Sequence, residues 1–143
     1  MERGKRMSML IRPEVAKKNK YYISRHRYYE LKHYCLQYNE WKENITLLTP
    51  KISRGEFSVK QDGIISDPTS RIAIKRAYYS NLIKQLEDCC IEADKEIGKY
   101  ILLAVTQDLS YQKLLAKYDV PFSKQLYYNR YRRFFWLLSK IRE

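Results

Sequence analysis

The chain is poor in the residues that interrupt helices, with four glycines and four prolines among 143 residues. Sandwiches and barrels of β-strands need many tight turns, and glycine and proline are the residues that form such turns. We therefore expect an all-α fold, with two long helices followed by a C-terminal helical helix-turn-helix module.

Cysteine and histidine are also scarce. The cysteines are Cys35, Cys89 and Cys90, an odd number with two adjacent, which does not fit a disulfide framework. The histidines are His26 and His33, and no group of these residues has the spacing of a zinc site. We expect cysteines that pack as small apolar residues, no bound metal, and a reduced, cytoplasmic location.

Long apolar runs and catalytic motifs are missing as well. No stretch approaches the roughly 18 apolar residues of a membrane span, and the first residues lack the apolar core of a signal peptide. The sequence has no glycine-rich phosphate loop and no nucleophile motif, and no pair of carboxylates stands out. We therefore expect no membrane partner, no cofactor and no enzymatic activity.

Basic residues are what the chain has in excess. It carries 28 lysines and arginines against 16 acidic residues, for a net charge of +12. Such an excess creates a long-range field that attracts polyanions. Nucleic acid is the first partner to expect, and an anionic membrane surface is the second. The 14 tyrosines can pack their rings while their hydroxyls stay in water, so many need not be fully buried.

Three regions are predicted along the chain. Residues 1–20 form a basic tail with seven basic and two acidic residues. Both a frayed, solvated terminus and an arm that touches DNA phosphates or enters a minor groove fit this composition. Residues 21–66 hold a long helix and a linker. Residues 67–143 form a helical domain, with the helix-turn-helix at about 109–140.

Periodic apolar residues predict the helices before that motif. The first runs from about Ser24 to Leu48, with Ser24 or Asn19 as its cap, and its stripe fits either internal packing or a dimer seam. The second begins at Asp67, which can cap it ahead of Pro68, and ends near Asp94; a third covers about 95–107, with Asp94 as its cap. The two stripes are Leu31, Tyr34, Tyr38, Trp41, Ile45 and Leu48, and Ile72, Tyr79, Ile83, Leu86, Cys90 and Ala93.

Residues 109–142 have the pattern of a helix-turn-helix. Ser110 can cap its first helix and Ser123 its second, and Pro121 ends the first helix because it pushes the preceding residue out of the helical conformation. Asp119 stands where the turn often needs a positive φ, which aspartate tolerates better than most residues. The inner face of the second helix is predicted to consist of Leu126 or Tyr127, then Tyr131, Phe134 and Leu138.

A resemblance follows from these residues. An apolar helix with Ile101, Leu102 and Val105 precedes Leu109-Ser110-Tyr111, and a basic helix then reaches Arg132-Arg133. From Tyr100 to Arg133 the chain resembles region 4 of bacterial sigma factors. With the long helices before it, it is similar to phage-encoded transcription regulators of the ArpU/RinA type. The resemblance implies a DNA-binding regulator in the cytoplasm of a bacterial host. Two features depart from it: the turn is one residue longer, and the aromatic run Phe134-Phe135-Trp136 suggests a buried helix end, packed on the long helices or on a second subunit.

Docking in the usual way would bring the first turns of the second helix to the base edges and its arginines to phosphates. Glutamine and asparagine match the paired donor and acceptor of adenine, and lysine reaches guanine acceptors. The base-contact candidates are Ser123, Lys124, Gln125, Tyr128 and Asn129, and the phosphate candidates are Arg130, Arg132, Arg133, Lys113 and Lys140.

The expected partner is double-stranded DNA, and a second copy of the chain and host RNA polymerase or another host protein are further candidates. Three other functions stay open. One is DNA packaging, in the manner of a small terminase subunit. Another is inhibition of a host nucleic-acid machine through the aromatic residues Phe135 and Trp136. The last is RNA binding by a basic and aromatic surface.

Overall fold

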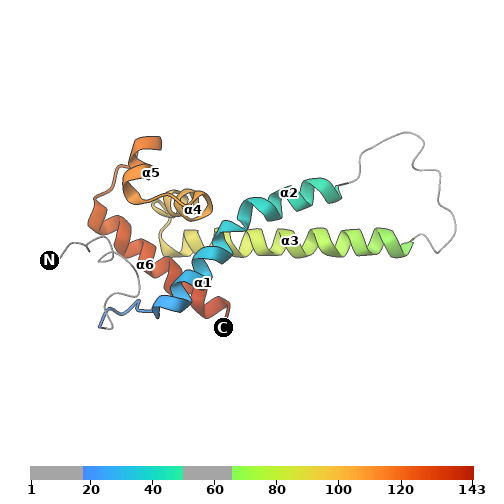
Figure 1. Cartoon of the computed structure of the whole chain (residues 1–143), viewed down its shortest axis with the longest axis horizontal. Coiled ribbons are helices and arrows are strands. Elements are labelled where there is room, and N and C mark those ends of the chain that lie inside the picture. Colours follow the sequence, from blue (N-terminus) through green and yellow to red (C-terminus); the bar gives the residue numbers. More distant parts are fainter. Residues whose placement is uncertain (1–17, 50–65) are drawn as a thin grey trace. The chain divides into compact units, whose positions relative to one another are not determined.

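The structure is a computed structural model that describes residues 18–49 and 66–143. These residues form helices and no strands (Figure 1), which confirms the all-α prediction. Most of the predicted tail and of the predicted linker lies outside them. In chain order the helices are α1 (Arg25–Leu36), α2 (Tyr38–Leu48), α3 (Ser66–Ala93), α4 (Gly98–Gln107), α5 (Tyr111–Lys117) and α6 (Lys124–Ile141).

The described residues fall into two compact units. Unit 1 is drawn from Met1–Gln37 and Leu86–Glu143, and unit 2 is Tyr38–Gln85. Unit 1 thus combines α1 with the last turns of α3 and with α4, α5 and α6. The predicted regions divide the chain differently, because the sequence alone does not show that α1 packs on α4 and α6.

The helix predicted from Ser24 to Leu48 is present as two helices, α1 and α2, with a break at Gln37. Ser24 caps α1 as predicted, and its hydroxyl accepts a hydrogen bond from the Arg27 amide at 3.3 Å. At the break the Gln37 amide donates to the Tyr34 carbonyl at 3.1 Å, three residues back instead of four. This tighter turn ends α1 where unit 1 gives way to unit 2.

Helix α3 matches the second predicted helix to within one residue at each end. It begins at Ser66, so Asp67 lies inside the helix and not before it as a cap. The predicted apolar stripe is buried only in its second half, at Leu86, Cys90 and Ala93, whereas Ile72 is 39% exposed. The helix is therefore present as the periodicity predicted, but only the second half of its apolar stripe is buried against other residues.

A short turn joins α3 to α4 in unit 1. The predicted helix from residue 95 starts at Gly98, and the Asp94 carboxylate accepts hydrogen bonds from the amides of Glu96 and Ile97 at 2.8 and 2.9 Å. Asp94 therefore caps the turn that precedes the helix. A Cβ at Gly98 would overlap the Cys90 carbonyl oxygen and lie 2.8 Å from its carbon, so the crossing requires glycine.

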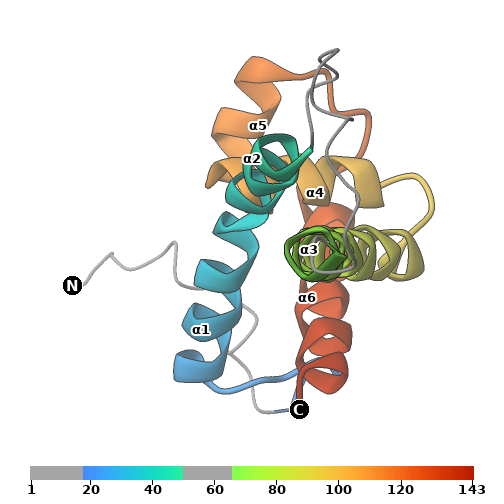
Figure 2. The ribbon, with the colours of Figure 1, turned by 90° about the vertical axis from the view of Figure 1, so that its right-hand side faces the viewer.

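In unit 1, α1 and α6 lie side by side and both contact α4 (Figure 2). Arg27 of α1 ties the end of α6 down: its guanidinium donates to the Ser139 hydroxyl and carbonyl at 3.1 and 2.9 Å, and to the Arg142 carbonyl at 3.2 Å. The last carbonyls of a helix have no partner within it. Arg27 supplies donors to two of them.

The three cysteines are reduced and buried. Burial raises the pKa of Cys89 to about 12, so its thiol stays protonated, and the thiol donates to the Phe134 carbonyl at 3.6 Å. These residues pack as small apolar side chains, as predicted.

Candidate nucleic-acid interface

The two helices of the predicted motif are α5 and α6, joined by residues 118–123. The Ser110 hydroxyl accepts a hydrogen bond from the Lys113 amide, and the Ser123 hydroxyl accepts one from the Leu126 amide, both at 3.2 Å. Each cap satisfies an amide that the start of a helix leaves without a partner. Both predicted caps are confirmed.

Side chains on α4 and α5 hold the turn. The Tyr111 hydroxyl donates to the Phe122 carbonyl at 2.9 Å, and Gln107 donates to the Tyr118 hydroxyl at 3.1 Å. The expectation of a positive φ at Asp119 was wrong: among the described residues that are not glycine, Asp108 alone has one, 58°, where it ends α4. The left-handed residue therefore precedes the motif and is not part of its turn.

Helix α6 has two contrasting faces. One is buried and consists of Tyr127, Phe134, Phe135 and Leu138, which are at most 1% exposed. Residues three or four positions apart share a helix face, and a run with this spacing covers the opposite side. We call this run the outward face of α6; its members are Gln125, Asn129, Arg132, Arg133, Trp136 and Lys140. Polar amides occupy its first turns, and cations with an aromatic ring occupy the rest.

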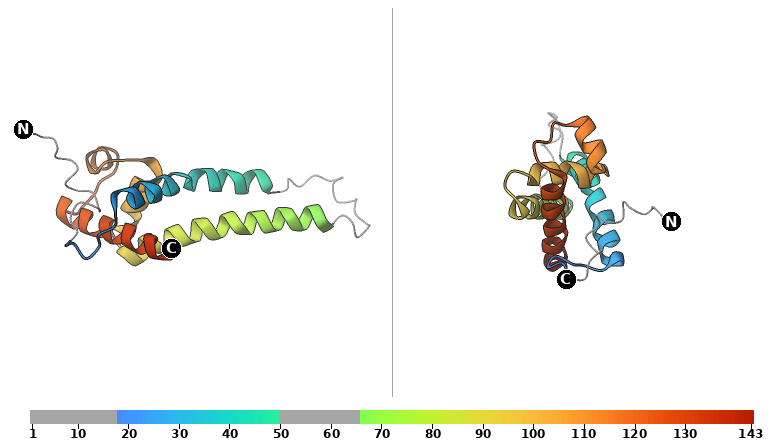
Figure 3. Two further views of the ribbon diagram at one scale, coloured as in Figure 1. Left: turned by 60° about the horizontal axis from the view of Figure 1, so that its bottom comes forward. Right: turned by 90° about the vertical axis from the view of Figure 1, so that its left-hand side faces the viewer.

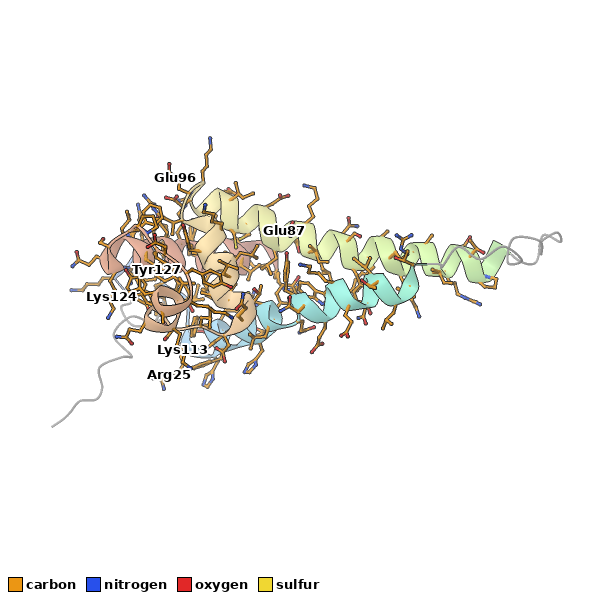
Figure 4. The ribbon with its side chains drawn as sticks, turned by 90° about the horizontal axis from the view of Figure 1, so that it is seen from above. Arg25, Glu87, Glu96, Lys113, Lys124 and Tyr127 are labelled. Atoms are coloured by element: carbon orange, nitrogen blue, oxygen red, sulfur yellow. The ribbon has the colours of Figure 1, made fainter. Side chains whose placement is uncertain are left out.

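The predicted base-contact residues are not equivalent in the structure. Lys124 and Gln125 are exposed, and Asn129 is half-buried. Figure 4 shows Lys124 at the outer edge of unit 1 and Tyr127 between its helices. Ser123 is exposed but its hydroxyl is used as the cap of α6. Tyr128 is 9% exposed, so it is corrected to a core residue whose ring cannot reach a base edge.

Tyr128 instead fixes α6 against the start of α5. Its ring centroid lies 5.9 Å from that of Tyr111. Burial raises the pKa of Tyr128, and the nearby backbone of Tyr111 opposes the shift. Periodicity had placed Leu126 or Tyr127 inside; the structure buries Tyr127 and leaves Leu126 41% exposed.

The predicted phosphate contacts differ in how far their charge is already satisfied. Arg130 forms an ion pair with Asp94, its Nε 3.3 Å from a carboxylate oxygen, so it is the weakest candidate. Arg132 is half-buried, and its Nε has no hydrogen-bond partner among the described residues. Burial lowers the pKa of Arg132, but an arginine remains charged. Because this Nε is enclosed by protein, a DNA phosphate could meet Arg132 only through the other nitrogens of its guanidinium.

Of the other three phosphate candidates, one lies on α5 and two lie on α6. Lys113 is exposed on α5, one turn after the Ser110 cap. Arg133 donates to the Tyr21 hydroxyl at 3.3 Å, and the Lys140 ammonium lies 4.5 Å from the centre of the Trp136 ring. The segment before α1 therefore reaches the outward face of α6. Sequence reasoning assigned Lys20 to the tail and missed Tyr21, because no local pattern indicates a contact 112 residues away.

The comparisons leave the chain without identified relatives: no family model matches it, and neither a curated protein nor a solved structure is significantly similar to it. The resemblance of residues 100–133 to sigma factor region 4 therefore stays a prediction. In the described ranges, no three potential metal ligands gather into a site. No helix in the same ranges combines the length and apolarity needed to cross a membrane.

Proposed function

We propose that this protein binds double-stranded DNA through the outward face of α6 and regulates transcription in a phage-infected bacterial cell. The observation that carries the proposal is that α6 has two faces: one is rich in side-chain amides and cations, and the other is buried in the core of unit 1. Gln125 and Asn129 point to base readout, and Arg132 and Arg133 to phosphates. On this proposal the protein acts in the cytoplasm as a homodimer, with RNA polymerase as a candidate partner.

The rigidity of α6 supports this proposal. Base readout requires side chains held in a fixed register on the duplex, and helices position side chains better than loops do. Here α6 is capped by Ser123, bonded at its end by Arg27 and packed through rings such as Phe135, which is 0% exposed. A groove-binding helix with these supports would lose little conformational freedom on binding.

Selection from random duplexes tests the proposal directly. Purified protein is incubated at two salt concentrations with random duplexes of about three helical turns, and the bound fraction is sequenced. We expect salt-sensitive binding that enriches one motif, and a two-fold symmetric motif would report the dimer. Binding without enrichment would leave only the net charge explained and would reject sequence-specific regulation.

Two substitutions test the groove-facing residues. Gln125→Ala or Asn129→Ala should relax the preference at one base position, at a cost of about 1–3 kcal/mol for the preferred base. Asn81→Ala is the matched control, because Asn81 is an exposed asparagine of α3 in unit 2. An unchanged motif in both α6 variants would reject this docking mode.

The competing functions are affected unequally. A protein-binding role for Phe135 conflicts with its full burial, so its replacement would destabilise the core of unit 1 instead of removing a contact with a partner. Trp136 is half-buried and stays available to that hypothesis. Packaging predicts ring-sized oligomers, and RNA binding predicts a preference for single strands. Measurements of mass in solution and of binding to single strands separate both from the regulator.

A further inference from the structure

Three cations gather around two rings in tilted contact, where the chain leads into α1. The Tyr21 and Trp136 ring centres lie 5.5 Å apart. The Lys20 ammonium is 5.1 Å from the Tyr21 ring centre, and Lys140 is 4.5 Å from that of Trp136. Arg133 donates to the Tyr21 hydroxyl at 3.3 Å. We call this group, Lys20, Tyr21, Arg133, Trp136 and Lys140, the Tyr21–Trp136 cluster.

The charge of this cluster is not balanced within the part of the chain that the structure describes. The ion pairs of Arg27, Lys32 and Arg130 involve no cation of the cluster. The ring faces attract cations, but they carry no net charge and leave the repulsion between the cations in place. The positive charge is felt locally, since the hydrogen bond from Arg133 holds the pKa of Tyr21 below its usual value. An anion would relieve this repulsion.

The cluster shares the outward face of α6 with the residues proposed to read bases. From Gln125 to Lys140 is about 22 Å along a helix that rises 1.5 Å per residue, which corresponds to about six phosphates of one DNA strand. Figure 3 shows the segment that leads into α1 passing beside the second half of α6. The sequence before Lys20 carries six more basic residues and two acidic ones, and Lys20 is the last residue of the predicted basic tail.

We propose that Lys20, Arg133 and Lys140 bind backbone phosphates of double-stranded DNA, at a second contact separate from the base-reading turns of α6. Tyr21 and Trp136 hold the three cations around one pair of rings. The contact carries no sequence information and extends the DNA footprint along the whole of α6. It rests on the proposed function, because it takes the same duplex as its ligand.

The test uses the double variant Lys20→Gln/Lys140→Gln, which removes two exposed ammonium groups and keeps both rings. Affinity for the selected duplex is measured over a series of salt concentrations. We expect the slope of log affinity against log salt to fall by about 1 for each lysine, with the enriched motif unchanged. Hydroxyl-radical footprinting should show lost protection at one end of each half-site only.

Lys99→Gln is the matched control. Lys99 is exposed in unit 1, and its ammonium lies 5.2 Å from the centre of the Tyr100 ring, so it has the same local setting without the cluster. We expect an unchanged salt slope in this variant. A loss of slope per lysine as large in the control as in the double variant would show a general charge effect and overturn the proposal.

Failure of the second contact is distinguishable from failure of the proposed function. If the wild-type protein enriches no motif, the proposed function fails first. If the motif is enriched but the double variant keeps the wild-type salt slope and footprint, the second contact is overturned while DNA readout stands. Loss of affinity for single-stranded RNA but not for the duplex would also overturn it, because RNA would then be the ligand.

Discussion

Helix α6 and the first part of α3 in unit 2 are both basic helices with apolar residues at helical spacing, and they differ in what those residues contact. In α6, Phe134, Phe135 and Leu138 are 0% exposed. In α3, Ile74 and Tyr78 are 67% and 58% exposed. The pattern is sufficient to form both helices. Burial also depends on partner helices, and α6 has them in α1 and α4.

The same contrast extends to the charged residues of the two helices. In α6, Arg133 is oriented by its hydrogen bond to the Tyr21 hydroxyl. In α3, Arg71 and Lys75 are exposed. A cation that packing holds in place loses less conformational freedom when it meets a phosphate. This difference is why the interface is placed on α6, although α3 also carries positive charge.

The largest expected effect comes from removing a ring in α6. Phe135→Ala should lower the free energy of unfolding by about 3–5 kcal/mol, because it leaves a cavity in the core of unit 1. Ile74→Ala in α3 should change it by less than about 0.5 kcal/mol. Urea denaturation followed by circular dichroism measures both. Equal losses would show that Ile74 is buried in solution and would remove the contrast between the helices.

A second prediction concerns a glycine-to-alanine substitution in a helix, whose effect on the free energy of unfolding should have the opposite sign to the usual one. Replacing glycine by alanine within a helix ordinarily stabilises by up to about 1 kcal/mol. Gly98→Ala should instead destabilise by about 1–3 kcal/mol, because the new Cβ meets the Cys90 backbone and no flexible side chain can yield. Ser80→Ala, at an exposed position of α3, is the control and should stabilise by a few tenths of a kcal/mol. A stabilised Gly98→Ala variant would contradict the close crossing.

Local chemistry explains which parts of the fold the sequence could predict. The caps at Ser24, Ser110 and Ser123 were correct because each depends on a hydroxyl and an amide three residues ahead. The break at Gln37 had no such signal, since neither glycine nor proline is near it. Asp67 was predicted to precede α3 but lies in its first turn, because nothing in the sequence there distinguishes the two positions.

The interface was harder to predict than the fold. Tyr127 and Tyr128 are adjacent and chemically identical, so periodicity alone could not show that the core takes both. What buries Tyr128 is Tyr111, on a different helix. Lys20 and Tyr21 join the outward face of α6 through contacts across more than a hundred residues. Local patterns predicted the helix that carries the interface, whereas its full membership depends on tertiary packing.

Alkaline pH should weaken the packing of α6. Burial raises the pKa of Tyr127 above the value of 10.0 that it has when exposed. The stabilisation from the neutral hydroxyl is therefore complete below pH 10 and is lost as the pH rises above it. For this one tyrosine the loss is about 1.4 kcal/mol per pH unit. Urea midpoints on both sides of pH 10 measure it, and Tyr127→Phe should flatten the slope by that amount. An unchanged slope in Tyr127→Phe would place the alkaline loss elsewhere.

The smallest effect separates two tyrosines of unit 1 that differ in one hydrogen bond. The Tyr111 hydroxyl donates to the Phe122 carbonyl at 2.9 Å, whereas the buried Tyr127 hydroxyl has no partner among the described residues. Tyr111→Phe should cost about 1 kcal/mol, because the turn before α6 loses a bond and a carbonyl loses its donor. Tyr127→Phe should be neutral or slightly stabilising at neutral pH, because it removes a buried group without a partner. Tyr78→Phe, at an exposed position of α3, gives the baseline.

If Tyr127→Phe cost as much as Tyr111→Phe, a bound water or another group would have to form a hydrogen bond with the Tyr127 hydroxyl. If neither differed from the baseline, the hydrogen bond to Phe122 would not hold the turn, and α6 would owe its position to ring packing alone.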